Sequence, residues 1–228
     1  AAVLLLPPLA TAAAGPFLAR DFTTGTGTLS VSLLQPAVPQ DRKFDQAFID
    51  AALAWHIDQI ARAPGALVVS PESSLPLLPQ QIDAEGWAGL TGPVSAPGRG
   101  ALLGLFTGGP TEGWMNSVIG LSADSRPGGG GIYRYGKRHL LPFGEFIPPG
   151  FGWFVALLGI PIGDQVPGTV EAPFEAAGQR LRPLICYEDL FGEEIAGGVL
   201  GEGGATVLVN ASNLAWFGTV MIQDQHLQ

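Results

Sequence analysis

The chain has 228 residues, of which 46% are hydrophobic and only 14% are charged, and it contains 33 glycines, 20 prolines and one cysteine. This apolar content excludes a mainly disordered chain, and a single cysteine cannot form an intramolecular disulfide. The formal net charge of −9 argues against a nucleic-acid-binding protein, because the only tight basic cluster is Arg134, Lys137 and Arg138. The same acidity would not attract anionic lipid headgroups, so any membrane contact has to be hydrophobic.

Both ends of the chain resemble parts of longer elements. Residues 1–19 carry no charge and include three prolines, and no basic segment precedes them as it would in a signal peptide. We expect residues 1–20 to be the trailing end of a membrane-spanning segment or a linker, the alternative being an apolar leader or a disordered terminus. Residues 221–228 have the pattern of the beginning of a helix, so we expect the chain to be a piece of a longer protein.

Short apolar strands alternate with helices between these ends. The expected strands cover residues 28–34, 66–69, 101–106, 115–121, 132–135, 181–185 and 205–209, and the expected helices cover residues 44–60 and 190–200. The Gly/Pro-rich turn at residues 108–113 suggests an antiparallel pair, and Pro183 places its strand at an edge or a bulge. This alternation predicts an α/β layered domain.

Residues 142–167 fit no regular element and are rich in aromatic residues, glycine and proline. A long apolar loop of this kind is typically functional, for example as a lid or a lipid-facing arm.

Cys186 is the candidate nucleophile. A lone cysteine in an apolar stretch is usually a small buried hydrophobe, but this one ends the strand at 181–185, where α/β folds expose reactive groups. A helix beginning directly after it is expected to lower the thiol pKa. Of the three histidines, His56 reads as an ordinary helix residue and His226 lies near the end of the chain, while His139 stays open as a proton acceptor.

Glu72 and Lys137 are the other candidate partners of the thiol. Each residue follows an apolar strand and therefore stands at a strand end. The Glu72 carboxylate could accept the thiol proton, and the Lys137 ammonium could stabilise an oxyanion. The alternative is a solvated loop acid and a solvated loop lysine, which are common. Spacing alone does not decide between the two interpretations.

Five segments, in order, carry a resemblance to a known family. They are SLLQPAVPQDRKFD (residues 32–45), PESSLP (71–76), YGKRHLLPFGEFIP (135–148), LICYEDLF (184–191) and NASNLAWFG (210–218). Over residues 28–228 the chain resembles the nitrilase-like domain of the apolipoprotein N-acyltransferase family, in the carbon–nitrogen hydrolase superfamily, and the PFGEF and SNxAWFG signatures are specific to that branch. The resemblance implies an αββα sandwich within a protein of the bacterial inner membrane, with this domain facing the periplasm.

The resemblance also implies roles for individual residues. The implied catalytic residues are the nucleophile Cys186, the general base Glu72 and the oxyanion-stabilising Lys137, and the implied supporting residues are Glu145, Tyr187 and Glu188. Two positions depart from the family pattern: Leu214 stands where members commonly have Asp, and Phe44 where they often have Trp. No metal or cofactor is expected, because the chain lacks paired His/Cys spacing.

The reaction implied by the resemblance is transfer of a fatty acyl chain from a phospholipid, through a cysteine thioester, to the N-terminal amine of a diacylglyceryl-cysteine apolipoprotein. Phe143, Phe146, Trp153 and Trp216 are candidate lipid contacts, although the arm's aromatics could instead pack against a membrane part. Two alternatives remain: a soluble nitrilase-type amidase with the same three residues, and a catalytically dead, membrane-attached interaction module, against which the intact Glu72, Lys137 and Cys186 argue.

Overall fold

The computed structural model describes residues 25, 27–37, 45–126, 130–152, 165–169 and 172–214. Residues 1–20 and 221–228, for which we predict a membrane segment or linker and a helix start, lie outside the described residues, as do Phe44, Trp153, Trp216 and His226. Within the described ranges, no helix has the length and apolar character needed to cross a membrane.

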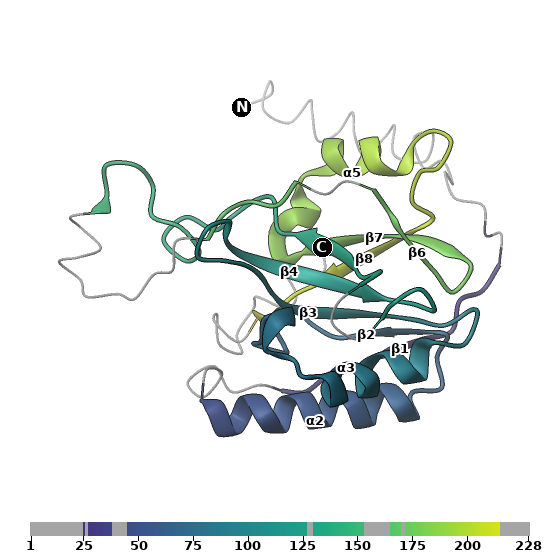
Figure 1. The fold of residues 1–228 in the computed structure, drawn as a ribbon. Coiled ribbons are helices and arrows are strands. Elements are labelled where there is room, and N and C mark those ends of the chain that lie inside the picture. The colour runs from purple at the N-terminus through teal and green to yellow at the C-terminus, as the bar shows by residue number, and fades with distance from the viewer. Residues whose placement is uncertain are drawn as a thin grey trace, which may run out of the picture.

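Two β-sheets face each other, and helices cover their outer surfaces (Figure 1). Helices α2 (Gln46–Arg62) and α3 (Ala84–Thr91) lie below the five-stranded sheet, and α5 (Gly192–Val199) lies above the three-stranded sheet. The predicted α/β class and αββα sandwich are therefore confirmed.

The five-stranded sheet has the order β1-β2-β3-β4-β5. Its strands are β1 (Val31–Leu33), β2 (Leu67–Val69), β3 (Gly100–Gly109), β4 (Gly113–Leu121) and β5 (Tyr133–Gly136). β1, β2 and β3 pair in parallel, whereas β3, β4 and β5 pair antiparallel. The antiparallel pair predicted around the Gly/Pro turn is confirmed, and its register extends from Ala101↔Leu121 to Gly109↔Gly113.

The three-stranded sheet consists of β6 (Phe174–Ala176), β7 (Gln179–Ile185) and β8 (Val207–Ala211), with β7 in the centre. β6 pairs antiparallel with β7 only as far as Leu181, whereas β8 pairs in parallel through Ile185. At Pro183, β7 thus has a strand partner on one side only among the described residues. This local edge agrees with the prediction from a residue that has no N–H to donate.

The helices follow the apolar periodicity of the sequence. The buried residues of α2 recur three or four positions apart, as Ile49, Ala52, His56 and Ile60. The sequence did not predict α3 or β6, which have eight and three residues. Asp83 begins α3 by accepting the Gly86 N–H at 2.7 Å. The described residues also include the short 3₁₀ helices η1 (Pro79–Gln81), η2 (Gly92–Val94) and η3 (Cys186–Leu190).

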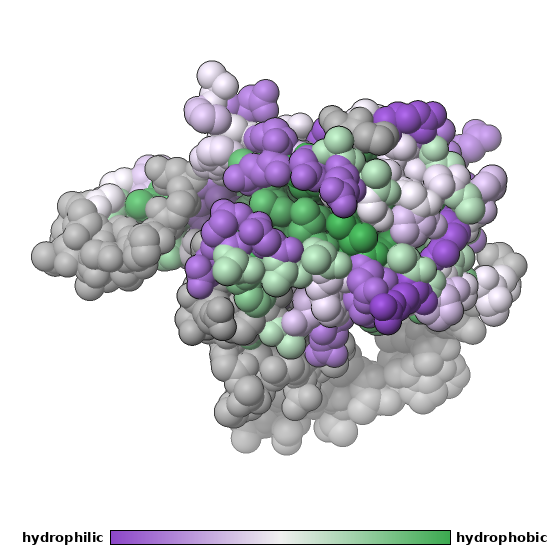
Figure 2. All heavy atoms as spheres, turned by 60° about the horizontal axis from the view of Figure 1, so that its bottom comes forward, coloured by the Kyte–Doolittle hydropathy of each residue, from purple (hydrophilic) through white to green (hydrophobic). Residues whose placement is uncertain are grey.

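Two apolar clusters hold the layers together. Alternate residues of β3 serve both, since Leu103 faces the α2–α3 layer and Leu102 faces the second sheet. On the helix side, partly buried residues such as Leu53 and Ile57 close the first cluster. Figure 2, which views the molecule from this side, shows a strip of apolar side chains bordered by polar ones. Burial of each large apolar side chain in the two clusters, such as Leu102 or Leu103, contributes about 1.5–3 kcal/mol. This packing therefore fixes the strand ends that carry the candidate site.

Candidate active site

A buried lysine lies between two buried carboxylates at one end of the sandwich. Lys137, directly after β5, has 2% of its surface exposed, and its Nζ lies 3.5 Å from Glu72 Oε1 and 3.0 Å from Glu145 Oε1. Burial lowers the pKa of Lys137, but the charges of Glu72 and Glu145 outweigh it and raise the pKa overall. The ammonium group therefore stays charged, and the structure brings together three of the predicted site residues.

Asn116 is a member of this cluster that the sequence did not predict. It lies in β4 with 4% of its surface exposed, and its Nδ2 donates to Glu72 Oε1 at 2.7 Å and to Glu145 Oε1 at 2.9 Å. The backbone carbonyl oxygen of Asn116 accepts the backbone N–H of Lys137 at 2.8 Å. One side chain thus bridges both carboxylates, and the sequence signal for it is only an amide side chain within a buried strand.

The Glu72 loop packs directly on β3. A Cβ at Gly104 would lie 2.1 Å from Pro71 O, so only glycine allows the loop to approach this strand. Ser73 has a φ of 44°, in the left-handed region that non-glycine residues rarely adopt. Glu72 Oε2 accepts the Asn213 N–H at 2.9 Å from the segment after β8. Both oxygens of the carboxylate are therefore fixed by the surrounding sandwich.

Cys186 begins η3 at the point where β7 ends, and its side chain is half-buried. Its φ of 57° also lies in the left-handed region, and backbone strain of this kind costs about 1–3 kcal/mol and concentrates at functional sites. Burial raises the pKa of the Cys186 thiol, and the charge of Glu72 raises it further, while Lys137 opposes both. The expected lowering of the thiol pKa is therefore wrong: only a five-residue 3₁₀ helix follows, and burial and Glu72 outweigh the groups that lower it. A neutral thiol of this kind needs a base before it can act as a nucleophile.

Glu188 joins the turn that carries Cys186 to the turn that carries Lys137. The residue is 3% exposed, and its carboxylate accepts four hydrogen bonds. Oε2 accepts from Ile185 N at 2.7 Å and Tyr135 Oη at 2.9 Å, and Oε1 accepts from Arg138 N at 2.6 Å and His139 N at 3.2 Å. A buried carboxylate with four donors holds the two turns in one geometry.

The rings of Tyr187 and His139 both lie next to the ring of Phe191. The Lys137 Nζ lies 5.5 Å from the centroid of the Tyr187 ring, whose hydroxyl donates to Leu140 O at 3.0 Å. The His139 ring stacks on Phe191 with centroids 3.6 Å apart, and its Nε2 lies 2.9 Å from Glu194 Oε1. This geometry directs His139 toward Glu194, whereas the charge of Glu72 acts directly on the Cys186 thiol. Of these two predicted proton acceptors, Glu72 is the one whose charge affects the pKa of the Cys186 thiol.

Residues 138–152, called the arm from here on, contact the cluster through the buried Glu145 and belong to a segment that projects from the sandwich (Figure 1). Phe143 is 44% exposed and meets Phe151 edge to face with centroids 5.5 Å apart, and Leu141 is also exposed. Phe146 is half-buried, and its carbonyl oxygen accepts the Phe143 N–H at 2.9 Å. Two of the four candidate lipid contacts are thus described, and they lie on the segment that carries Glu145.

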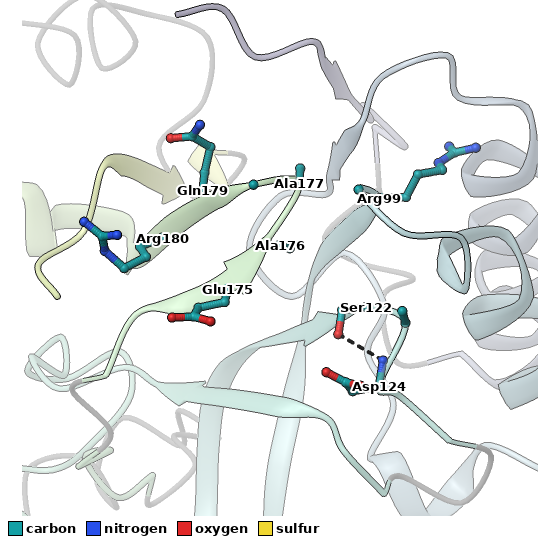
Figure 3. Close-up of a pocket in the computed structure, with 11 residues that line it drawn as sticks. Arg99, Ser122, Asp124, Glu175, Ala176, Ala177, Gln179 and Arg180 are labelled. Carbon is teal, nitrogen blue, oxygen red and sulfur yellow. Dashed lines mark hydrogen bonds between the residues drawn. The ribbon is translucent and has the colours of Figure 1, made fainter. Parts of the chain in front are cut away.

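A hollow of about 440 Å³ lies at the end of β4 away from Asn116. Figure 3 shows that Arg99, Glu175 and Arg180 line it together with the turn at Ser122 and Asp124. It contains none of the predicted site residues. Within the described ranges, no group of three or more His, Cys, Asp or Glu side chains is arranged to hold a metal ion.

Comparison with known sequences agrees with the motifs. A protein named apolipoprotein N-acyltransferase from Verminephrobacter eiseniae is 47% identical over 205 residues, which cover 88% of this chain and 38% of that protein. A protein of the same name from Ralstonia nicotianae is 45% identical over 202 residues, with 88% and 38% covered. The chain thus spans about two fifths of the length of these relatives, and the predicted resemblance is confirmed.

Solved structures share the fold. A CN-hydrolase superfamily protein from Xanthomonas campestris, with an arsenic adduct in its active site, matches with a TM-score of 0.54 at 19% identity, covering 84% of this chain and 69% of that one. An amidase of the nitrilase superfamily from Nesterenkonia matches with a TM-score of 0.51 at 20% identity, covering 84% and 68%. The family model for carbon-nitrogen hydrolase matches residues 30–228, and the chain therefore belongs to the carbon-nitrogen hydrolase family.

Proposed function

We propose that this chain is the catalytic domain of an N-acyltransferase that moves a fatty acyl chain from a phospholipid to the N-terminal amine of a diacylglyceryl-cysteine apolipoprotein. The observation that carries the proposal is the buried cluster of Glu72, Lys137 and Glu145, whose charges act on the thiol of Cys186. The name shared by the relatives supports this substrate class.

In the first half-reaction, Glu72 accepts the proton of the Cys186 thiol, and Sγ attacks the ester carbonyl of the phospholipid. Lys137 stabilises the oxyanion of the tetrahedral intermediate with a charge that its two carboxylates keep in place. The ester C–O bond then breaks, the lysophospholipid alkoxide takes the proton from Glu72, and a thioester remains on Cys186.

In the second half-reaction, the α-amino group of the apolipoprotein attacks the thioester carbonyl. A C–N bond forms, the C–S bond breaks, and Glu72 accepts a proton from the attacking amine and passes it to the departing thiolate. Both donor and acceptor are lipids, so access from a bilayer is required. The exposed apolar side chains of the arm, such as Phe143, suit a contact with acyl chains, and we place the domain on the periplasmic side of the bacterial inner membrane.

An amidase that acts on a small amide is the second candidate function, because the fold match includes an amidase of the nitrilase superfamily. The same three residues would form an acyl-enzyme from an amide, and water would replace the lipoprotein amine as the second nucleophile. The two functions therefore differ in the acyl donor that loads Cys186 and in the nucleophile that unloads it.

The test is to incubate the purified protein with a phospholipid of defined acyl chain and to locate the adduct by mass spectrometry of the Cys186 peptide. We expect an acyl thioester that Cys186→Ser abolishes and that a diacylglyceryl-cysteine peptide discharges as an amide. Leu190→Ser is a matched control, because Leu190 is exposed in the same 3₁₀ helix and its variant should keep the adduct. An adduct that persists in Cys186→Ser contradicts the proposal, and loading only by a short-chain amide favours the amidase.

A further inference from the structure

A buried polar chain connects helix α2 to the Glu72 loop. His56 is 0% exposed, its Nδ1 lies 2.7 Å from Ala52 O, and its Nε2 lies 3.1 Å from Ser74 Oγ. Because a carbonyl oxygen only accepts hydrogen bonds, Nδ1 carries the proton that points to Ala52. Burial lowers the pKa of His56 more than the Ala52 hydrogen bond raises it, so the imidazole is neutral at neutral pH.

The series of buried hydrogen bonds continues through two serines to β3. Ser74 Oγ forms a hydrogen bond with Ser70 Oγ at 2.9 Å, and Ser70 Oγ accepts the Gly104 N–H at 3.2 Å. Ser70 and Ser74 stand two residues before and two residues after Glu72, and both are buried. The hydrogen bonds thus attach both ends of the segment that carries the carboxylate, one end to β3 and the other to α2.

From this geometry we infer that His56 and Ser74 are positioning residues that set the Glu72 carboxylate for its work as a base; the inference rests on the proposed function. Neither side chain forms a hydrogen bond with the carboxylate, so both act through the loop.

The loop needs such support because its conformation is not one that the backbone favours. Ser73 has a φ in the left-handed region, and the loop lies against Gly104 too closely for any Cβ. A strained segment persists only where the surrounding contacts over-determine it. An apolar residue at position 56 could fill the same volume, but it would leave the Ser74 hydroxyl without its partner on α2.

The experiment compares four single variants of the whole protein and one double variant, which combines His56→Leu with Ser74→Ala. His56→Leu and Ser74→Ala remove the hydrogen bond between α2 and the loop, whereas His56→Gln retains a side-chain amide that can reach Ser74. Thr91→Val is the matched control, since the buried Thr91 hydroxyl donates to Trp87 O at 2.7 Å in the neighbouring helix α3, away from Glu72. For each variant we would measure the thermal midpoint, the maximal rate of Cys186 acylation and the phospholipid concentration at half-maximal rate.

We expect His56→Leu and Ser74→Ala to lower the maximal acylation rate about tenfold with an unchanged half-saturating concentration, which is the pattern of a defect in the chemical step. The double variant should be no slower than the slower single one, because both remove one hydrogen bond. His56→Gln should stay within about twofold of the unaltered protein, and Thr91→Val should lose stability without loss of rate. Unchanged rates in both His56→Leu and Ser74→Ala, or a rate loss in Thr91→Val of the same size, would overturn the inference.

A second readout does not depend on phospholipid. The chain has a single cysteine, so the pH dependence of iodoacetamide alkylation can be followed on the Cys186 peptide. Glu72 and Glu145 raise the pKa of this thiol and Lys137 lowers it, so displacement of Glu72 should move the alkylation midpoint to lower pH. If the protein is not acylated by phospholipid but His56→Leu and Ser74→Ala still show this shift, the proposed function fails and the positioning role stands. Absence of the shift contradicts the positioning role whatever the substrate.

Discussion

Glu72 and Glu145 contact the same two groups but stand on different parts of the molecule. Each carboxylate is buried, lies next to the Lys137 ammonium and accepts a hydrogen bond from Asn116 Nδ2. Glu72 receives its further hydrogen bond from the Asn213 N–H after β8, whereas Glu145 receives it from the Leu141 N–H within its own arm. One carboxylate is thus held by the sandwich and the other by a projecting segment.

The difference in support points to different work. After burial, the charge of Glu72 is the largest of the influences on the pKa of the Cys186 thiol, and that of Glu145 is the smallest. A general base has to keep its place relative to the nucleophile, which the packed loop on Gly104 provides. Glu145 instead connects the arm to Lys137, whose charge would stabilise the oxyanion in the proposed reaction.

The largest effect is expected from Lys137→Met, because it removes the group that both carboxylates share. Two buried carboxylates would lose their compensating charge, which typically costs about 3–5 kcal/mol of unfolding free energy. The acylation rate should fall at least about 100-fold with loss of the oxyanion contact. Urea unfolding and Cys186 peptide mapping measure the two effects.

Arg62→Met is the control for Lys137→Met. Arg62 pairs with Asp58 at 2.7 Å on the exposed surface of α2, where an ion pair contributes about 0.3–0.5 kcal/mol. If Lys137→Met is no more destabilising than Arg62→Met, the carboxylates do not depend on a shared cation.

The next effect separates the two carboxylates. Glu72→Gln should lower the maximal acylation rate about 10²- to 10⁴-fold, because a glutamine cannot accept the thiol proton. Its amide retains an oxygen for the Asn213 N–H, so the fold should persist. Single-turnover acylation of Glu72→Gln and Glu145→Gln checks the assignment of Glu72 as the base. The assignment is wrong if Glu145→Gln proves the slower of the two.

Glu145→Gln should cost about tenfold in the same assay and should mainly affect the arm. Weaker attachment to Lys137 exposes the backbone hydrogen bonds of the arm, so hydrogen exchange should quicken at the Glu145 and Gly144 amides, both of which donate to Leu141 O. Exchange at Ser70 and Leu75, which donate to β3 carbonyls, should stay unchanged. Glu112→Gln, in the exposed β3–β4 turn, should alter neither region.

The sequence predicted the parts of this site that depend on where strands end. Apolar runs stop just before Glu72, Lys137 and Cys186, and the chain has to turn at each of those points. The carboxyl ends of β2 and β7 then place two of these residues at one end of the sandwich, as the α/β class implies.

The rest depends on register and packing, which are long-range properties. Asn116 reaches the cluster because Ser117, its neighbour in β4, pairs with Gly136, which precedes Lys137. His56 reaches Ser74, 18 residues further along the chain, because α2 and the segment after β2 share the first apolar cluster, which includes Ala52 and Leu75. The thiol pKa rises because burial and a carboxylate outweigh the turn that follows Cys186, and a strand-and-helix pattern contains no information on that balance.

The smallest expected effect is on stability at alkaline pH, and it distinguishes the carboxylates once more. The folded pKa of the Cys186 thiol is raised above its ordinary value of 9.0, so the folded state holds a proton that the unfolded chain releases. Stability is therefore unaffected below about pH 9 and falls as pH rises further, by at most about 1.4 kcal/mol per pH unit.

Cys186→Ala should flatten this decline in stability between about pH 9 and pH 10. Lys137, whose pKa is raised from 10.5, adds a decline of the same sign only at higher pH. Glu72→Gln should flatten it partly, because removal of that charge lowers the thiol pKa, whereas Glu145→Gln should change it least. Urea unfolding at a series of pH values measures the slopes. Equal slopes in the unaltered protein and Cys186→Ala would mean that the thiol is not held neutral by its surroundings, and the distinct action of Glu72 on Cys186 would then be lost.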